Sequence, residues 1–172
     1  MTLIVCSLAD MPEVVRTRRP SHMLTLIDPA TPVVRPLTLA AERHLRLDLF
    51  DVAEAAEGAP DRESVARLLD FARAWDASAP MVVHCFAGIS RSTASAYAIA
   101  CERNPAADEL AIARALRGAA AHAYPNRRIV ALADELLGRR GRMVDAIEAI
   151  GGNGFVPTGA PFDLPVSYPV RA

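Results

Sequence analysis

The sequence contains no lysine, and all 19 of its basic residues are arginine. With 20 acidic residues the formal net charge is −1, so no excess of positive charge predicts binding to nucleic acid or to an anionic membrane. Aromatic residues make up 5% of the chain, whereas 52% of its residues are hydrophobic and 23% are charged. This balance is typical of a globular protein, and 172 residues suffice for one domain whose core needs no disulfide or metal.

Cysteine is also scarce, and the sequence has no long apolar run. Only Cys6, Cys85 and Cys101 are present, and their odd number and wide spacing argue against a disulfide framework or a zinc site. No apolar run reaches the length that spans a membrane, and residues 1–6 lack a basic leader. We therefore expect a cytoplasmic protein in a reducing compartment, with no cofactor, no metal and neither nucleic acid nor a membrane as partner.

Short apolar runs alternate with helical patterns along the chain. The patterns predict strands at 2–6, 21–27, 44–50 and 81–84, and helices at 8–15, 61–75, 92–101, 109–116, 126–137 and 142–150. This alternation predicts an α/β fold with a short, mostly parallel central sheet flanked by helices. We expect residues 1–150 to form a single domain and residues 151–172, which contain several Gly and Pro, to form an extended tail packed on it.

The most informative part of the sequence is Met81–Thr93. A short buried strand ends there in His84-Cys85, and five residues later Arg91-Ser92 opens an Ala-rich helix. Between a strand and a helix, the N–H groups of a tight loop converge and the helix dipole favours negative charge, so this segment is suited to bind an anion. The same environment stabilises a thiolate at Cys85, which makes it a nucleophile near neutral pH. The planar guanidinium of Arg91 can bind two oxygens of a tetrahedral oxyanion.

This pattern resembles the signature of the protein tyrosine phosphatase superfamily, and in particular its compact, dual-specificity-like bacterial members. Supporting features extend the resemblance over residues 20–140. The resemblance implies a phosphomonoester hydrolase, either a protein tyrosine or a dual-specificity phosphatase, that acts through a phosphocysteine intermediate. A phosphorylated protein or a small phosphoester is then the expected substrate. The alternative for the motif alone is a buried cysteine followed by an arginine that caps a helix.

The loop after the nucleophile is predicted to bind the phosphoryl oxygens. The backbone N–H groups that we expect to line this cradle belong to Phe86, Ala87, Gly88, Ile89, Ser90 and Arg91. Gly88 lies where the chain must curl tightly, and glycine tolerates positive φ. The resemblance implies that the hydroxyl of Ser92 binds the cysteine sulfur and helps it to leave, although a hydroxyl at a helix start is also an ordinary structural feature.

Two further residues are expected to support the loop. His84 cannot act as a direct base on Cys85, because adjacent residues of a strand point to opposite faces. The resemblance implies instead that the His84 ring orients the loop, with a buried core histidine as the alternative. Tyr124-Pro125-Asn126 resembles the Pro-Asn that follows the signature in dual-specificity members and opens a helix near the loop. Asn126 is equally compatible with a simple N-cap role.

The leaving group also needs a proton from a carboxylic acid on an exposed loop. In compact members of the family this residue is an Asp some thirty residues before the cysteine, between a strand and a helix. Asp51 fits that place, since it follows a predicted strand and lies 34 positions before Cys85. Asp48, Glu54 and Glu57 are also candidates, and all of these carboxylates could instead be a solvated turn.

Two other functions compete with the phosphatase. One is a catalytically silent module that binds a phosphate or a phosphoprotein with the same loop but lacks a working acid. The other is sulfur or arsenate chemistry on a related loop, as in rhodanese-like proteins, which the five-residue spacing followed by Arg-Ser disfavours. The loop carries no charged residue besides Arg91, whereas phosphoinositide-specific relatives carry basic residues there, so the resemblance makes inositol phosphates less expected as substrates. Cys6 and Cys101 are predicted core residues, although oxidation could join one of them to Cys85.

Overall fold

The computed structural model describes residues 1–152, 154 and 156–171. In the described chain, one sheet contains the strands β1 (Thr2–Cys6), β2 (His22–Ile27), β3 (His44–Asp48), β4 (Met81–His84) and β5 (Phe162–Pro165), in the order β3-β2-β4-β1-β5. The helices are α1 (Met11–Arg18), α2 (Arg62–Ala74), α3 (Arg91–Arg103), α4 (Glu109–Ala119), α5 (Arg127–Leu136) and α6 (Arg142–Ile150), and a short 3-10 helix covers Ala41–Arg43. β1, β2, β3 and β4 run parallel to one another, so the predicted fold class is confirmed.

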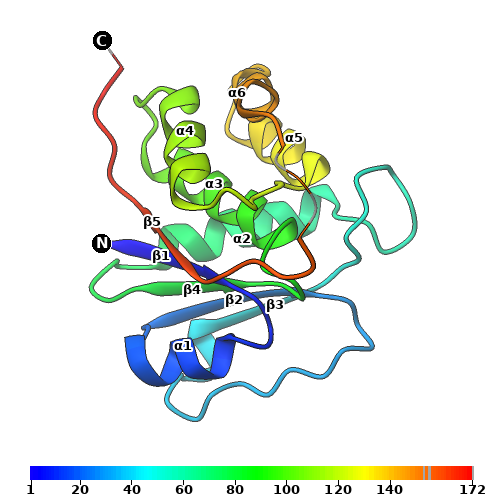
Figure 1. Cartoon of the computed structure of the whole chain (residues 1–172), viewed down its shortest axis with the longest axis vertical. Coiled ribbons are helices and arrows are strands. Elements are labelled where there is room, and N and C mark those ends of the chain that lie inside the picture. Colours follow the sequence, from blue (N-terminus) through cyan, green and yellow to red (C-terminus); the bar gives the residue numbers. More distant parts are fainter. Residues whose placement is uncertain (153, 155, 172) are drawn as a thin grey trace.

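The sheet lies between two layers of unequal thickness. Helices α2 to α6 cover one face, and α1 with the loop of residues 28–40 covers the other (Figure 1). A large apolar cluster fills the first interface, and a smaller one around Ile4, Met23 and Val82 fills the second. The carboxyl ends of the parallel strands meet at one edge of the sheet, which is where such folds place their ligands.

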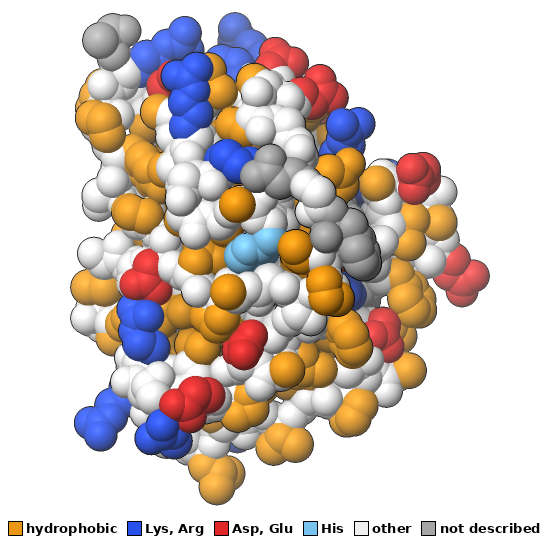
Figure 2. Space-filling view, in the orientation of Figure 1, with side chains coloured by type: hydrophobic (Ala, Val, Ile, Leu, Met, Phe, Trp, Pro, Cys, Tyr) orange, Lys and Arg blue, Asp and Glu red, His pale blue; other side chains and the backbone are white. Residues whose placement is uncertain are grey.

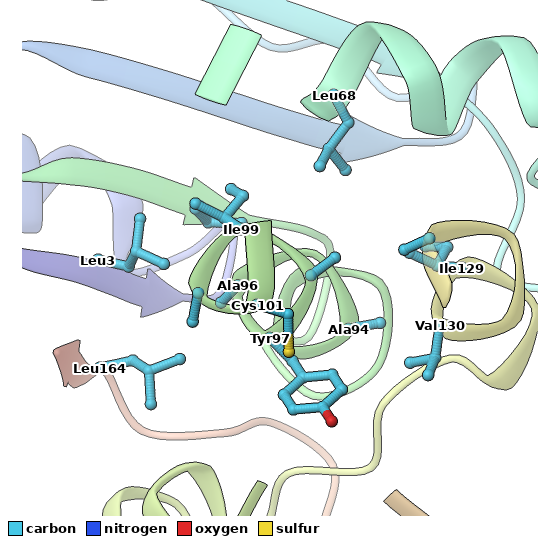
Figure 3. Packing of buried hydrophobic residues seen from close by; sticks show 14 of the residues in the cluster. Leu3, Leu68, Ala94, Ala96, Tyr97, Ile99, Cys101, Ile129, Val130 and Leu164 are labelled. Carbon is cyan, nitrogen blue, oxygen red and sulfur yellow. The ribbon is translucent and has the colours of Figure 1, made fainter. Parts of the chain in front are cut away.

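Helix α3 is the central helix of the thick layer. Every residue from Arg91 to Cys101 is buried, because α3 packs on β1 and β4 below and on α2, α4 and α5 around it. Small side chains such as Ala94 and Ala96 let the neighbouring elements approach closely, while Tyr97 and Ile99 fill the space between them (Figure 3). Burial of each large side chain stabilises the fold by about 2 kcal/mol. The N-terminus of α3 is therefore held rigidly at the sheet edge.

Helix α1 begins three residues later than the sequence pattern predicts. The prediction started the helix at Leu8, whereas α1 starts at Met11 with Pro12 in its first turn. Proline lacks the N–H that an interior helical residue donates, so it is tolerated only in the first turn. The hydroxyl of Ser7 donates to the carboxylate of Asp10 at 2.6 Å and accepts from its N–H at 3.1 Å, which orders the residues just before α1.

The C-terminal residues add a strand that the sequence patterns did not predict. β5 pairs antiparallel with β1, with Leu164 opposite Leu3. Pro161 precedes this strand and Pro165 ends it, which is compatible with an edge position because proline cannot donate to a ladder. The pairing ties residues 162–165 to the sheet. The domain boundary at residue 150 stays a prediction.

The surface carries charges of both signs. On the face shown in Figure 2, arginine and acidic side chains are interspersed with apolar ones. Within the described ranges, no helix combines the length and the apolar character needed to cross a bilayer.

Candidate active site

The predicted strand, loop and helix lie in sequence at the carboxyl edge of the sheet. β4 ends at His84, the loop runs from Cys85 to Ser90, and α3 begins at Arg91. Cys85 lies at the base of the loop with 1% of its surface exposed. Its Sγ lies 3.2 Å from the Oγ of Ser92, within hydrogen-bond distance for a sulfur. The structure therefore brings the candidate nucleophile and the hydroxyl after the arginine together.

Most carbonyl groups of the loop bind segments outside it. Four of them accept from neighbouring segments: Phe86 from the N–H of Leu8 at 3.1 Å, Ala87 from Gly159 at 2.8 Å, Ile89 from Tyr124 at 2.9 Å and Ser90 from Asn126 at 3.2 Å. Among the described residues, none of the backbone N–H groups from Phe86 to Arg91 donates to a protein acceptor. A loop with its carbonyl groups bound outside and its N–H groups unbound is suited to bind the oxygens of an anion.

Gly88 allows the tight turn by which the loop closes. Its φ is +73°, a conformation that other residues rarely adopt. A Cβ at this position would lie 2.8 Å from the backbone N of Ser7 and 2.9 Å from the carbonyl C of Cys6, at the end of β1. Both the backbone conformation and the close approach of β1 therefore require glycine.

We expect Gly88→Ala to damage the loop. Strain at a positive φ costs about 2 kcal/mol, and the methyl group meets backbone that cannot move aside. The variant should lose about 2 kcal/mol of unfolding free energy in urea denaturation and bind inorganic phosphate roughly tenfold more weakly. Gly118→Ala is the matched control, because its Cβ has no atom within 4 Å and it lies inside α4. Equal phosphate affinity of Gly88→Ala and the wild type would contradict this role.

The guanidinium of Arg91 is buried and only partly engaged. Its side chain is 7% exposed, and its NH1 donates to the carbonyl of Leu49 at 2.7 Å. Its Nε lies 3.7 Å from the Oδ2 of Asp51 and has no hydrogen-bond partner among the described residues. A buried guanidinium held by a single carbonyl keeps donors to offer to an oxyanion.

Asp51 contacts the loop directly. Its Oδ1 accepts from the hydroxyl of Ser90 at 2.7 Å and from the Nδ2 of Asn126 at 2.8 Å. Asp48 is not part of this arrangement, because its carboxylate pairs with the Nε of Arg46 at 2.7 Å. Of the candidate carboxylates, Asp51 is therefore the one that the described contacts place against the loop.

Glu54 and Glu57 lie away from this arrangement, on the segment between β3 and α2. Both residues are exposed. Their carboxylates therefore face solvent, as expected for a solvated turn.

Asn126 combines both roles that its sequence position allows. Its Oδ1 accepts from the N–H groups of Arg128 and Ile129, each at 3.1 Å, which caps α5. Its Nδ2 donates to Asp51, and its own N–H donates to Ser90. Sequence reasoning missed the contact between Ser90 and Asp51, since these residues are 39 positions apart and no local pattern marks the pair.

His84 is buried beneath the loop. It is 0% exposed, its Nε2 lies 2.8 Å from the Oγ1 of Thr25, and its Nδ1 lies 3.4 Å from the carbonyl O of Cys85. Burial lowers the pKa of His84 to about 4, so the ring is neutral at physiological pH. The ring thus contacts the chain where it enters the loop, on the face of β4 that α1 covers.

The buried His84 should make the protein sensitive to acid. Its pKa is about 4 in the fold against an ordinary 6.5, so the stability that it contributes is fully present above pH 6.5 and is lost as the pH falls towards 4. The loss amounts to about 3 kcal/mol. Urea denaturation at pH 7.5 and 4.5 should show a smaller loss for His84→Asn than for the wild type. Equal losses in the two proteins would assign the acid sensitivity to other groups.

The other two cysteines, Cys6 and Cys101, lie in the core. All three cysteines are free and buried. Burial raises the pKa of Cys6 to about 12, with a contribution from Asp10, and burial likewise raises the pKa of Cys101 to about 12. Both thiols are therefore protonated at neutral pH and behave as core side chains.

The comparisons with known proteins agree with this geometry. The family model described as protein-tyrosine phosphatase matches residues 55–122, a range that contains α2, β4, the loop, α3 and α4. This match covers less than half of the chain and supports a place for it in the protein tyrosine phosphatase superfamily. The match agrees with the family resemblance of the sequence and supports a phosphatase.

Solved phosphatases share the fold. The chain is similar to the PTP-2 phosphatase of Cydia pomonella, with 24% identity and a TM-score of 0.61 over 77% of this chain and 84% of that one. It is similar to DUSP15, with 18% identity and a TM-score of 0.61 over 86% and 89%. It is also similar to PTPMT1 in complex with PI(5)P, with 17% identity and a TM-score of 0.61 over 80% and 91%. No curated protein matches the chain in sequence.

Proposed function

We propose that this phosphatase is a cysteine-dependent phosphomonoester hydrolase that forms a phosphocysteine on Cys85. The observation that carries the proposal is the loop itself. Its N–H groups from Phe86 to Arg91 have no acceptor among the described residues, Cys85 begins it and the buried guanidinium of Arg91 follows it, which supports an anion position inside the loop. Three equatorial oxygens of a transferring phosphoryl group need this kind of cradle.

The proposed reaction has two steps. The thiolate of Cys85 attacks phosphorus while Asp51 gives its proton to the leaving oxygen, so a P–S bond forms and a P–O bond breaks. Water then attacks the phosphocysteine, Asp51 takes a proton from it, and the P–S bond breaks. The hydroxyl of Ser92, 3.2 Å from the sulfur, donates to the departing thiolate.

Exposed aromatic side chains support a phosphotyrosine or a mixed phosphoprotein specificity. Phe50 is 45% exposed next to Asp51, and Phe86 is 60% exposed next to Cys85. Tyr124 is 55% exposed, and its N–H binds the loop carbonyl of Ile89. Exposed aromatic residues that adjoin the acid and the nucleophile in the sequence support an aryl phosphate as substrate, because aromatic rings pair favourably.

The proposed setting is a reducing compartment such as the cytoplasm. A free, buried Cys85 serves as a nucleophile only while its sulfur stays reduced. The substrate is accordingly a phosphorylated protein or a small phosphoester of that compartment.

One contact favours a second candidate, a silent phosphate-binding module. Asp51 already accepts two hydrogen bonds, from Ser90 and Asn126, and these donors fix its carboxylate against the loop. A carboxylate held in this way can stabilise the structure of the loop instead of donating a proton.

The experiment that tests the proposal measures turnover and the intermediate together. The wild type should hydrolyse para-nitrophenyl phosphate in the presence of EDTA. Rapid acid quenching during turnover should add the mass of one phosphoryl group to the peptide that contains Cys85. Binding of inorganic phosphate without turnover would favour the silent module, and turnover with a phosphoryl group on any other residue would refute the assigned nucleophile.

A further inference from the structure

Three side chains connect the phosphate-binding loop with the far edge of the parallel strands. The Oγ1 of Thr25 lies 2.8 Å from the Nε2 of His84 and also 2.8 Å from the Nε2 of His44. Thr25 on β2 stands opposite His84 on β4 in the sheet register, and His44 begins β3 on the other side of β2. Thr25 and His84 are both 0% exposed, whereas His44 is half-buried.

The chemistry of the partners fixes the direction of each hydrogen bond. The carbonyl of Cys85 can only accept, so the Nδ1 of His84 carries the proton. The buried ring is neutral, which leaves its Nε2 as an acceptor, and the hydroxyl of Thr25 must donate its one proton there. The Oγ1 of Thr25 then accepts from the Nε2–H of His44. The result is a one-way series of donations from His44 through Thr25 and His84 to Cys85.

The carbonyl of Cys85 depends on this series of hydrogen bonds for its partner. In the described part of the chain no backbone N–H donates to it, whereas the carbonyl groups of Phe86, Ala87, Ile89 and Ser90 are held by neighbouring segments. The ring of His84 is therefore its hydrogen-bond partner at the point where the strand becomes the loop.

We propose that Thr25 and His44 are positioning residues for the phosphatase reaction, because they hold the His84 ring that fixes the carbonyl of Cys85 and so the start of the phosphate-binding loop. The inference rests on the proposed function, since it assigns a catalytic effect to two side chains that do not touch the phosphate. A wrongly oriented Cys85 carbonyl turns the following N–H groups away from the anion position.

Arginines surround the outer end of this series. Arg35 on the loop of residues 28–40 and Arg46 on β3 both face His44, and together with burial they lower its pKa. Arg46 and His44 also act on His84. These positive charges disfavour protonation of the His44 and His84 rings. They therefore keep the hydrogen bonds donated in the direction from His44 to Cys85. Protonation of His44 leaves its Nε2–H in place, so the series survives mild acid.

The decisive variant is Thr25→Val, which keeps the shape and removes the hydroxyl. The Nε2 of His84 then becomes a buried acceptor without a donor, and the ring loses its fixed orientation. We expect kcat/KM for para-nitrophenyl phosphate to fall roughly tenfold. We also expect the pH profile for alkylation of Cys85 by iodoacetamide to shift towards higher pH, because a misplaced loop stabilises the thiolate less. Thr25→Ser restores the hydroxyl and should restore both measurements.

Two further variants separate positioning from plain stability. Ile4→Val removes a methylene from a buried strand residue on the same face of the sheet and should lower the melting temperature without moving the alkylation profile. His44→Ala should lower kcat/KM about threefold in the wild type and have no further effect in Thr25→Val, because His44 acts through Thr25. An independent loss in that double variant would overturn the part assigned to His44.

The outcomes for turnover and for the thiolate are distinguishable. If the wild type turns over and Thr25→Val keeps both its kcat/KM and its alkylation profile, the positioning role is refuted while the proposed function stands. If the wild type does not turn over, the proposed function fails, and the alkylation profile alone then decides whether Thr25 acts on Cys85. The same alkylation shift in Ile4→Val as in Thr25→Val would reduce the effect to lost stability and would also refute the role.

Discussion

Replacement of Cys85 by serine is expected to lower kcat for para-nitrophenyl phosphate by at least about 10⁴-fold. The change exchanges one atom at the base of the loop, but a serine hydroxyl is not ionised near neutral pH and is a poor nucleophile without a base beside it. His84 cannot supply that base, because its ring contacts the backbone on the other face of β4. Activity is measured against pH in the presence of EDTA.

Binding of phosphate should survive this substitution. The loop N–H groups and Arg91 remain, and loss of a negative thiolate removes a repulsion against the phosphate dianion. The rise in melting temperature with inorganic phosphate should therefore equal or exceed that of the wild type. Cys101→Ala is the matched control, since Cys101 is equally buried but lies in α3 among core side chains. It should lower stability and leave kcat/KM within about twofold of the wild type. Turnover by Cys85→Ser at the wild-type rate would exclude Cys85 as the nucleophile.

Local patterns predicted the elements that build the loop. The apolar run before His84 and the Ala-rich helix after Arg91 appear in the structure as β4 and α3. Their burial follows from composition, because Met81–Val83 and most of Ser92–Cys101 offer no polar face to water. The helix after Asp61 was also predictable, since the carboxylate of that residue accepts from the N–H of Ser64 as an N-cap does.

Contacts between distant segments were not predictable in the same way. Asp51 meets Asn126 across 75 positions, and Thr25 meets His84 across 59. β5 forms because β1 offers an open edge, not because residues 162–165 alternate in hydrophobicity. Sequence patterns carry local periodicity, whereas these contacts depend on how separate elements pack. The sequence therefore predicts Asp51 as the acid from its position between a strand and a helix.

Asp51→Asn is expected to lower kcat roughly 100-fold for a substrate with a poor leaving group. The amide is isosteric, and its oxygen can still accept from Ser90 and Asn126, so the loop should keep its shape. An amide cannot give a proton to a leaving oxygen. The loss should therefore be larger for phenyl phosphate than for para-nitrophenyl phosphate, whose phenolate leaves without help. The fall of kcat/KM at high pH that a general acid produces should disappear in the variant.

The comparison with Asp48→Asn decides whether Asp51 transfers a proton or only stabilises the loop. The carboxylate of Asp48 binds Arg46 on β3, so its replacement should leave kcat within about twofold of the wild type for both phosphate esters. If Asp51 only holds Ser90 and Asn126 in place, its amide variant should lose the same factor with both esters and keep the fall at high pH. If Asp48→Asn instead shows the dependence on the leaving group, the acid lies at the end of β3. A selective loss with phenyl phosphate in Asp51→Asn alone identifies Asp51 as the proton donor, because only proton transfer to the leaving oxygen distinguishes the two esters.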